Sequence, residues 1–529
     1  MLLRPLTTMF VVGCLSSGEG VPFDADTATP DLGEPSPTDD SGEVDDTGLS
    51  DGVEPAPEVT VSRMGMASHL NALMEIAEAN GGNRAAGSPG YAASVAYVAE
   101  QLELAGYAVS TSSFDIEQEQ WDAPPDVAAE GLDGLTYGED FYVFGETGSG
   151  AVTAPITGVD LALPPTDGDE VSSGCEGVDF DGFTAGNIAL IQRGGCTFQT
   201  KVSNAVDAGA SAVLIFNTGT SGAVGIFGGT LDPDVENTIP VMALSYAVGE
   251  AIAALPEGTP VTVSLEFRVE LVPTQNVFAD TTGDHGRTVV VGAHLDSVVA
   301  GPGINDNGSG VALVLEMAMQ MAADGIRPDN RVRFAFWGGE ELGLLGSFNY
   351  VLNLPDDEHA DMMANLNFDM VASPNPARMI YDGNGSRFGD AGPAGSGEIE
   401  AIFSEWFAAE GLTSQETAFD GRSDYGPFIW TGIPAGGLFT GAEQPKTSAE
   451  QEAYGGLAGE AYDACYHQDC DTIDNLDLDV LDQMAGAAVH ATMGLAFYEG
   501  VLGGKARSVL RLPDWLPSSC AAHERIWRR

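Results

Sequence analysis

The residues best suited to chemistry lie in the stretch VVVGAHLDSVVAGPGINDNGSG, residues 289–310. Three valines lead into a short turn that carries His294 and Asp296, and Asp306 follows a loop rich in Gly and Pro. An imidazole and two carboxylates so close together can bind a divalent cation or transfer protons. This stretch is therefore the first candidate for a functional site.

Two adjacent carboxylates follow the mainly apolar run RVRFAFW, residues 331–337, after a pair of glycines. This run has the composition of a buried strand. Glu340 and Glu341 would be costly to place side by side at its end unless a cation or a shared proton compensated their charge. The pair therefore extends the candidate site.

Two more polar residues complete a set of metal-binding types. Asp369 lies within the apolar run 366–371, and His467 lies in the segment CYHQDCDT. The potential ligands are then His294, Asp306, Glu341, Asp369 and His467. Two imidazoles and three carboxylates suit a borderline ion such as Zn²⁺. Because there are five ligands and a carboxylate can bridge, two metal ions are more natural than one.

The elements that must position these residues alternate between strands and helices. The strand before His294 is followed by a helix expected over 311–321, and helices are also expected over 69–79, 91–105 and 480–498. This order predicts an α/β fold with a mixed, mainly parallel sheet covered by helices on both faces. Because ligands gather at the carboxyl ends of parallel strands, His294 and Asp306 stand where a site should be.

An ordered set of segments resembles the zinc aminopeptidases of the M28 metallopeptidase family, in particular the secreted Streptomyces-type enzymes. The segments are AHLDS, GINDNGSG, FAFWGGEELGLLGS, NFDMV, GRSDYGPF, GGLFTGAE and CYHQDCDT. The resemblance begins near Arg63, is interrupted by an insert, and resumes from about Thr274 to Glu499. It implies a three-layer zinc-exopeptidase fold and a hydrolase that removes N-terminal residues from peptides.

The same resemblance implies two Zn²⁺ ions per chain and a role for each ligand. Asp306 would bridge both ions, His294 and Asp369 would complete one site, and Glu341 and His467 the other. The residue types agree, since a carboxylate has two oxygens that can bind two cations. The many carboxylates would also suit Ca²⁺, but no definite calcium loop is found.

Four further residues receive expected roles. Glu340 would be the general base and acid, taking a proton from the attacking water and delivering it to the leaving amine. Asp296 would orient the imidazole of His294. By resemblance, Tyr466 would donate to the developing oxyanion, and Arg422 would line the region that receives the substrate N-terminus or first side chain.

The insert, expected over 118–271, has a different character. Its run IQRGGCTFQTKVSNAVDAGASAVLIFN alternates short strands with a small-residue helix and resembles the protease-associated (PA) domain. A lid over the substrate and a purely structural insert are equally consistent with it. We expect a disulfide between Cys175 and Cys196, as in an oxidising compartment. A second disulfide, between Cys465 and Cys470, would clamp His467.

The N-terminal segment resembles an export signal. Arg4 is the only basic residue of the first thirteen, a short apolar run follows it, and VVGC resembles a bacterial lipobox with Cys14 as the lipidated residue. An ordinary signal peptide or a misassigned start is the alternative. Residues 14–62 follow, and between Leu15 and Ser62 thirteen residues are Asp or Glu and none is Lys or Arg, which predicts an extended linker. We expect an exported protein, secreted or held on the cell envelope by a lipid anchor.

Length and charge limit the remaining possibilities. A chain of 529 residues predicts two domains and tails, here a peptidase domain over 63–117 and 272–500, the PA insert, and a basic tail over 501–529. The tail contains Cys520, for which the sequence offers no obvious partner. A net charge of −59 excludes nucleic acid as a partner, because phosphate binding needs a basic surface.

The leading interpretation is a monomeric aminopeptidase that acts on peptides with a free N-terminus and prefers large apolar first residues such as Leu. A glutamate-carboxypeptidase-like exopeptidase shares the ligands and the PA insert, but it needs cations for a terminal carboxylate, and Arg422 alone is thin support. A non-catalytic receptor built on the same fold would lack ligands or the base, and none is missing here.

Overall fold

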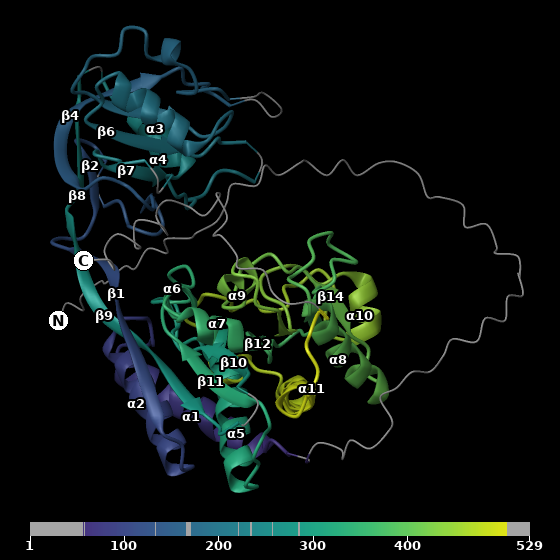
Figure 1. Cartoon of the computed structure of the whole chain (residues 1–529). Helices are drawn as coiled ribbons and strands as arrows, with labels where there is room; N and C mark the ends of the chain where they lie inside the picture. The colour runs from purple at the N-terminus through teal and green to yellow at the C-terminus, as the bar shows by residue number, and fades with distance from the viewer. Residues whose placement is uncertain are drawn as a thin grey trace, which may run out of the picture.

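The computed structural model describes residues 57, 59–132, 134–165, 171–220, 222–232, 235–256, 258–283 and 286–504. These residues form a larger body and a smaller domain, each built on its own mixed sheet, and a two-stranded ribbon joins them (Figure 1). The predicted α/β fold with an inserted small domain is confirmed. Within the described part of the chain, no helix has the length and apolarity needed to cross a bilayer.

The larger body is organised by a sheet of eight strands. In spatial order they are β1 (Val109–Trp121), β9 (Phe267–Asp280), β11 (Arg331–Trp337), β10 (Thr288–His294), β12 (Met362–Phe368), β15 (Ala435–Phe439), β13 (Met379–Tyr381) and β14 (Gln415–Thr417). The central strand β10 runs parallel to both β11 and β12, and β12 runs parallel to β15. Every residue of β10 and β12 is buried, which agrees with their mainly apolar sequences.

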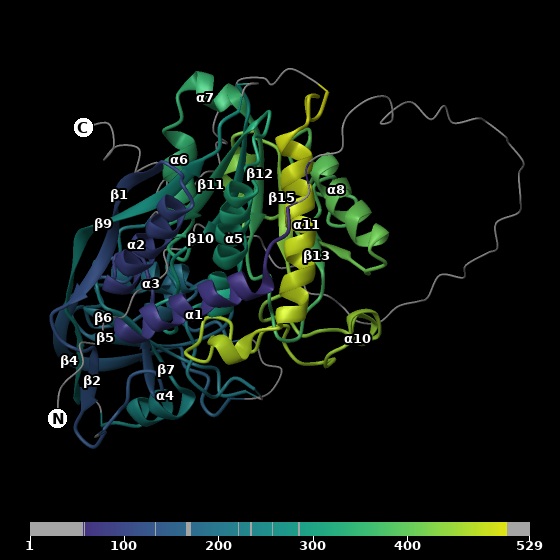
Figure 2. The same ribbon diagram turned by 90° about the horizontal axis from the view of Figure 1, so that it is seen from below.

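Helices cover both faces of this sheet. One face carries α1 (Arg63–Ala79), α2 (Pro89–Leu104), α5 (Gly310–Ala323), α8 (Ser396–Ala409) and α11 (Leu478–Ala496), as Figure 2 shows. The other carries α6 (Leu345–Leu352) and α9 (Gly426–Trp430). Short helices α7 (Asp356–Asp361), α10 (Ser448–Tyr454) and η3 (Ile473–Asn475) lie in the connections. Alternate residues of β10 enter the two cores, since Val289 and Val291 face the first and Val290 the second.

Capping side chains explain where the first two helices begin. The Ser62 hydroxyl accepts a hydrogen bond from the Gly65 amide, so α1 starts six residues before the apolar periodicity alone indicates. The Ser88 hydroxyl likewise accepts from the Tyr91 amide, and Pro89 occupies the first helical position of α2. The helices predicted over 69–79 and 91–105 are therefore present with earlier starts.

The smaller domain is a seven-stranded sheet with a core on each face. Its strands in spatial order are β2 (Asp126–Ala129), β8 (Pro260–Leu265), β4 (Gly150–Val159), β5 (Ile188–Gln192), β6 (Ala212–Phe216), β7 (Val241–Leu244) and β3 (Phe141–Val143). Its helices are α3 (Phe198–Asp207), α4 (Tyr246–Ala253) and the single turn η1 (Gly177–Phe180). The predicted disulfide between Cys175 and Cys196 is present.

The ribbon consists of β1 and β9, which pair without interruption from Val109 opposite Ala279 to Trp121 opposite Phe267. One end of β9 also pairs with β11, so the ribbon is continuous with the larger sheet. The predicted boundaries of the insert, residues 118 and 271, fall inside this ribbon. The smaller domain thus enters and leaves the larger body along paired strands (Figure 1).

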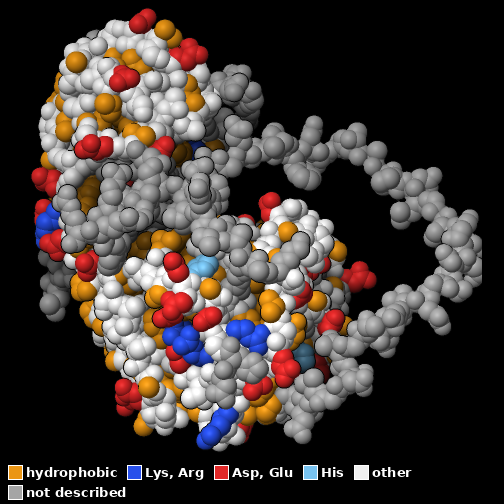
Figure 3. All heavy atoms as spheres, viewed as in Figure 1, with side chains coloured by type: hydrophobic (Ala, Val, Ile, Leu, Met, Phe, Trp, Pro, Cys, Tyr) orange, Lys and Arg blue, Asp and Glu red, His pale blue; other side chains and the backbone are white. Residues whose placement is uncertain are grey.

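Acidic side chains are spread over the face shown in Figure 3, and several Lys and Arg side chains gather on the larger body. This distribution agrees with the net charge of −59. Such an excess of one sign keeps a protein soluble and repels polyanions.

Candidate metal centre and adjoining pocket

The five predicted ligands lie together at the carboxyl ends of the central strands. His294 is the last residue of β10, Glu341 follows β11, and Asp369 follows β12. Asp306 lies in the short turn η2 (Ile304–Ser309), and His467 lies in the loop before η3. Residues more than 170 positions apart in the sequence therefore meet at one edge of the sheet, where a parallel arrangement directs them.

Asp306 lies between the two histidines. Its Oδ1 is 3.2 Å from Nε2 of His294, and its Oδ2 is 3.2 Å from Nε2 of His467. The other neighbour of His294 is Asp369, whose Oδ1 is 3.3 Å from Nε2. The other neighbour of His467 is Glu341, whose Oε2 is 3.1 Å from Nε2. Each oxygen of Asp306 thus belongs to a separate group of one imidazole and one further carboxylate.

These atoms fit divalent cations. Nε2 of His294, Oδ1 of Asp369 and Oε1 of Glu341 are buried and have no hydrogen-bond partner. Buried polar atoms without partners are costly, so such a group needs a compensating ion. The nitrogen and oxygen atoms are 3.1–3.3 Å apart. That spacing is close to the ~3.3 Å edge of a tetrahedron whose metal–ligand bonds are about 2.0–2.1 Å.

The two imidazoles are surrounded by negative charge. Burial disfavours the charged form of His294, but Asp369 and Glu340 outweigh burial and raise its pKa well above the ordinary value. Burial also opposes protonation of His467, yet its contacts with Asp306 and Glu341 raise its pKa to about 11. In the absence of a cation this cluster holds protons that a bound cation would displace.

Asp306 is fixed by the start of α5. The next residue, Asn307, accepts a hydrogen bond from the Gly310 amide through Oδ1 and donates one to the Phe368 carbonyl through Nδ2. A side chain at position 310 would meet that carbonyl, since an added Cβ would lie 2.1 Å from the Phe368 oxygen. Glycine is therefore needed at Gly310 for η2 to approach the end of β12.

Glu340 lies beside this cluster and faces the adjoining pocket. Its side chain is 11% exposed, and its Oε2 is 3.9 Å from Nε2 of His294. Burial raises the pKa of Glu340 well above its usual range, and the neighbouring Asp369 adds to the effect although His294 opposes it. A carboxyl group at the boundary between the cluster and the pocket can accept and release a proton.

Asp296 contacts both the imidazole of His294 and the backbone of the two glutamates. Its Oδ1 and Oδ2 accept hydrogen bonds from the amides of Glu340 and Glu341 at 3.2 and 3.3 Å. The nearest partner of the His294 Nδ1 is the main-chain carbonyl of Asp296 at 3.2 Å, whereas the carboxylate is 3.7 Å away. The carboxylate of Asp296 thus binds the backbone amides of both glutamates, and the main-chain carbonyl of Asp296 contacts the imidazole.

The loop that carries His467 is closed by the predicted disulfide between Cys465 and Cys470. Within it His467 has a positive φ of 58°, and the Tyr466 ring stacks on the imidazole with centroids 3.8 Å apart. The disulfide and the stacked ring both restrict the position of the imidazole. Tyr466 also lines the pocket beside the cluster.

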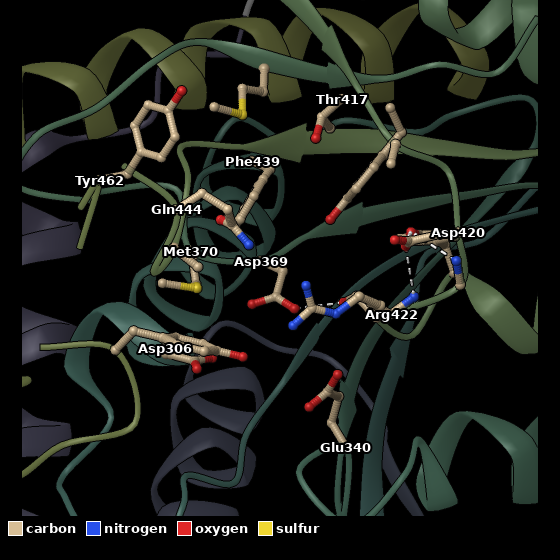
Figure 4. Close-up of a pocket in the computed structure, with 18 of the residues that line it drawn as sticks. Asp306, Glu340, Asp369, Met370, Thr417, Asp420, Arg422, Phe439, Gln444 and Tyr462 are labelled. Atoms are coloured by element: carbon tan, nitrogen blue, oxygen red, sulfur yellow. Dashed lines mark hydrogen bonds between the residues drawn. The ribbon is translucent and has the colours of Figure 1, made fainter. Parts of the chain in front are cut away.

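A pocket of about 510 Å³ opens next to these residues (Figure 4). Its walls include Met370, Met379, Tyr381, Phe388, Phe439 and Tyr462. Asp306, Glu340, Asp369 and Arg422 also line the pocket, and Figure 4 labels all four. Arg422 is half exposed, and its Nη2 is 3.9 Å from Oε1 of Glu443. The pocket thus joins a charged end to a mainly apolar interior.

Two residues at the site, Ser423 and Asp424, have no role predicted from the sequence. The Ser423 hydroxyl donates to Oδ2 of Asp369 at 2.6 Å, and Ser423 in turn accepts from the Asn367 side chain at 2.8 Å. Asp424 is fully buried, and neither of its carboxylate oxygens has a hydrogen-bond partner. The segment GRSDYGPF was the only signal for these residues. The remaining predicted site residue, Cys14, lies outside the described residues.

Comparison with protein families gives two matches. The model of peptidase family M28 matches residues 276–492, and the PA domain model matches residues 152–252. The first range contains all five predicted ligands and Glu340. The second lies within the smaller domain.

Similar proteins agree with these matches. An aminopeptidase from Pseudomonas aeruginosa (strain UCBPP-PA14) is 46% identical over 435 residues, which cover 81% of this chain and 80% of that protein. A probable lipoprotein aminopeptidase from Mycobacterium tuberculosis is 42% identical over 84% of this chain and 86% of that protein. Among solved structures, the aminopeptidase from Aneurinibacillus sp. strain AM-1 has a TM-score of 0.61 and 26% identity, covering 85% of this chain and 97% of that one.

Proposed function

The chain belongs to peptidase family M28 and is an aminopeptidase with a PA domain, and we propose that it hydrolyses N-terminal residues from peptides with two zinc ions and Glu340 as the general base. The observation that carries this proposal is the position of Asp306. Its two oxygens each face a different histidine at 3.2 Å. A single carboxylate so placed is suited to bridge two cations.

The proposed ligands divide into two equal sets around that bridge. His294 and Asp369 would hold one ion, and Glu341 and His467 the other. Imidazole and carboxylate ligands suit zinc, and the buried atoms without hydrogen-bond partners support a charge-compensating ion. When bound, zinc would polarise the scissile carbonyl and lower the pKa of a water molecule towards neutrality.

Glu340 would perform the proton transfers. Its carboxylate lies at the boundary between the ligand cluster and the pocket, so it can reach a water molecule that attacks a bound peptide. It would accept the proton of that water and then deliver it to the amine that leaves. The same carboxyl group can act first as the base and then as the acid, because it takes up one proton and gives the same proton back.

Two residues of the pocket wall would complete the catalytic arrangement. Tyr466 lines the pocket next to His467 and can donate its hydroxyl proton to the oxyanion that develops on the scissile carbonyl. Arg422 would contact the substrate near its N-terminal residue, since its side chain lines the same pocket as Glu340 and Asp369.

The substrate would bind with its free amino group near the carboxylates and its first side chain in the pocket. Acidic residues at the charged end favour an ammonium group and disfavour a blocked N-terminus. Met370, Met379 and Phe439 supply an apolar wall, which supports a preference for large apolar residues such as Leu.

We also propose that the protein is exported as a monomer, either secreted or anchored through a lipid at Cys14. The sequence VVGC supports the lipid anchor, and so does the name of the mycobacterial relative, which is called a lipoprotein. The two disulfides at Cys175–Cys196 and Cys465–Cys470 agree with an oxidising compartment.

The function can be tested with leucine-p-nitroanilide, its N-acetylated form and a peptide with C-terminal glutamate. We expect cleavage of the free-amine substrate alone and loss of that cleavage when a zinc chelator is added. Cleavage of the glutamate peptide, with neither anilide hydrolysed by metal-replete protein, would instead support the carboxypeptidase interpretation.

A further inference from the structure

The segment that runs from the end of β10 into the first residues of η2 is buried although it has little regular structure. We call residues 295–306 the metal loop, because it begins after His294 and ends with Asp306. Residues 295–297 and 301–306 are buried. A buried loop must find partners for its main-chain polar groups outside a helix or sheet. Those partners come from two distant parts of the chain.

Arg84, in the connection between α1 and α2, satisfies the carbonyls of this loop. It is completely buried, and its Nε and Nη2 donate to the carbonyls of Pro302 and Gly303 at 3.0 and 2.6 Å. Its Nη1 donates to the carbonyl of Leu295, and its main-chain amide donates to the hydroxyl of Ser297. The planar guanidinium thus joins both ends of the loop through three carbonyls.

Asp471 satisfies the amides on the other side. Its Oδ1 accepts from the amide of Asn305 at 2.8 Å, and its Oδ2 accepts from the amide of Asp306 at 3.0 Å. Its own carbonyl accepts from the amide of Ile304. Asp471 is buried and directly follows Cys470, which closes the loop of His467. One carboxylate therefore links the backbone of Asp306 to the segment that carries the second histidine.

We propose that Arg84 and Asp471 are positioning residues that hold the metal loop from opposite sides and thereby set the affinity of the site for zinc. The proposal rests on the metal centre of the proposed function. Neither residue is one of the proposed ligands, and neither lines the pocket. Arg84 also lies outside residues 276–492, so the N-terminal segment contributes to a centre whose ligands all lie elsewhere.

The contacts lie where a small displacement would matter most. Leu295 directly follows His294, and the Asp306 amide belongs to the residue that faces both imidazoles. If the loop relaxed by a fraction of an ångström, the two oxygens of Asp306 could no longer keep equal 3.2 Å distances to the two histidines. Groups that orient metal ligands commonly change metal affinity about 10–100-fold when they are removed.

Lys446 provides a matched control elsewhere in the same body. It is also buried, and its Nζ donates to the carbonyls of Pro376 and Gly455 at 2.7 and 2.8 Å. It is therefore a second buried cation that holds loops through their carbonyls, and among the described residues the hydrogen bonds of its Nζ go to Asn375, Pro376 and Gly455, outside the metal loop. A loss of stability without a specific effect on zinc should follow from its removal.

The experiment compares Arg84→Met, Arg84→Lys, Asp471→Asn and Lys446→Met in the full chain. Zinc affinity is measured by competition with a chelating dye, and the stability of each metal-free form by thermal unfolding. We expect zinc to bind about 10–100-fold more weakly to Arg84→Met and Asp471→Asn, and within ~2-fold of the wild type to Lys446→Met. The zinc affinity of Arg84→Lys should lie between those of the wild type and Arg84→Met, since an ammonium group keeps the charge but cannot donate to all three carbonyls in the planar geometry of a guanidinium.

Unchanged zinc affinity in folded Arg84→Met and Asp471→Asn would overturn the proposal. An equal loss in Lys446→Met would also overturn it, because the effect would then follow from general destabilisation. If Arg84→Met does not fold, Asp471→Asn decides, since it keeps the size of the side chain. A wild-type chain that binds no zinc would instead refute the metal centre of the proposed function.

Discussion

At the scale of single residues, the site is a concentration of carboxylates that a protein interior does not ordinarily tolerate. Asp306, Glu341 and Asp369 are buried within contact of two imidazoles, and two of the three have an oxygen without a hydrogen-bond partner. Buried charges cost free energy unless counter-charges compensate them. The two divalent cations of the proposed function would provide that compensation, and they would explain why one carboxylate lies between two histidines.

Glu340 and Glu341 should respond differently to the same substitution. We expect Glu340→Gln to lower kcat for leucine-p-nitroanilide about 10²–10⁴-fold, because the proton transfers lose their base, while zinc content stays at the wild-type value. The adjacent Glu341→Gln should lose zinc, since its Oε2 is 3.1 Å from His467 Nε2. Steady-state kinetics with metal analysis of both variants gives the comparison. Zinc loss in Glu340→Gln equal to that in Glu341→Gln would make Glu340 a ligand and not the base.

At the scale of elements, regular strands end at the site and irregular loops complete it. β10, β11 and β12 deliver His294, Glu341 and Asp369, whereas the metal loop delivers Asp306 and a disulfide-closed loop delivers His467. Strands are held in place by the hydrogen bonds to neighbouring strands, whereas loops depend on individual side-chain contacts. The elements at greatest risk of losing their geometry are therefore the two loops.

The disulfide of the His467 loop should matter for metal binding. We expect replacement of both Cys465 and Cys470 by Ala to weaken zinc binding about tenfold or more, because the imidazole gains freedom that binding must then remove. Replacement of Cys175 and Cys196, whose disulfide lies in the smaller domain, should leave zinc affinity unchanged. Dye competition on both double variants tests this, and equal affinities in the two would contradict it.

The ribbon carries a carboxyl group that should make stability depend on pH. Burial, with a contribution from Glu146, raises the pKa of Glu119 from its ordinary 4.5 to about 7, and its Oε2 has no hydrogen-bond partner. Between these values the folded state binds more protons than the unfolded state, so this contribution to stability is complete below pH 4.5 and is lost as the pH rises through 7.

Glu119→Gln should therefore stabilise the metal-free protein by about 1 kcal/mol at pH 8, after allowance for solvent screening, and leave it unchanged at pH 4.5. Unfolding by denaturant at the two pH values measures the difference. Glu117→Gln removes an exposed carboxylate two residues earlier and serves as the control. A gain at pH 4.5 as large as that at pH 8 would contradict the assignment.

At the scale of the whole molecule, the smaller domain is inserted into a hairpin. Because Trp121 pairs with Phe267, the two ends of the insert are adjacent, and a short turn could connect them without disturbing the larger sheet. The core of the larger body and that of the smaller domain are formed by separate sets of residues. This arrangement allows the peptidase body to fold as a unit.

Replacement of residues 122–266 by a two-residue Asn-Gly turn tests that independence. We expect the shortened protein to bind zinc as the full chain does and to hydrolyse leucine-p-nitroanilide with kcat/KM within about tenfold, since the ligands and the pocket lie in the larger body. A changed KM for long peptides alone would identify the smaller domain as a regulator of substrate access. Failure to fold or to bind zinc would contradict the prediction.

Local sequence patterns predicted the elements that end at the site. The strand over 331–337 has the predicted bounds, because its Val, Phe, Ala and Trp residues form a mainly apolar run that is buried in the sheet. The three carbonyls bound by Arg84 could not be predicted. They lie more than 200 residues away, and because every residue has a main-chain carbonyl, the residue type does not show which carbonyl is bound. The hydrogen bonds that the Asp296 carboxylate accepts from the amides of Glu340 and Glu341 could not be predicted for the same reason, because their donors are main-chain groups.

The number of zinc ions per chain tests the account most directly. Metal-free protein would be titrated with zinc while bound zinc and leucine-p-nitroanilide hydrolysis are measured together. A carboxylate bridging two sites predicts saturation at two zinc ions per chain, with full activity reached only at the second. Saturation and full activity at a single zinc ion would contradict the central role given to Asp306.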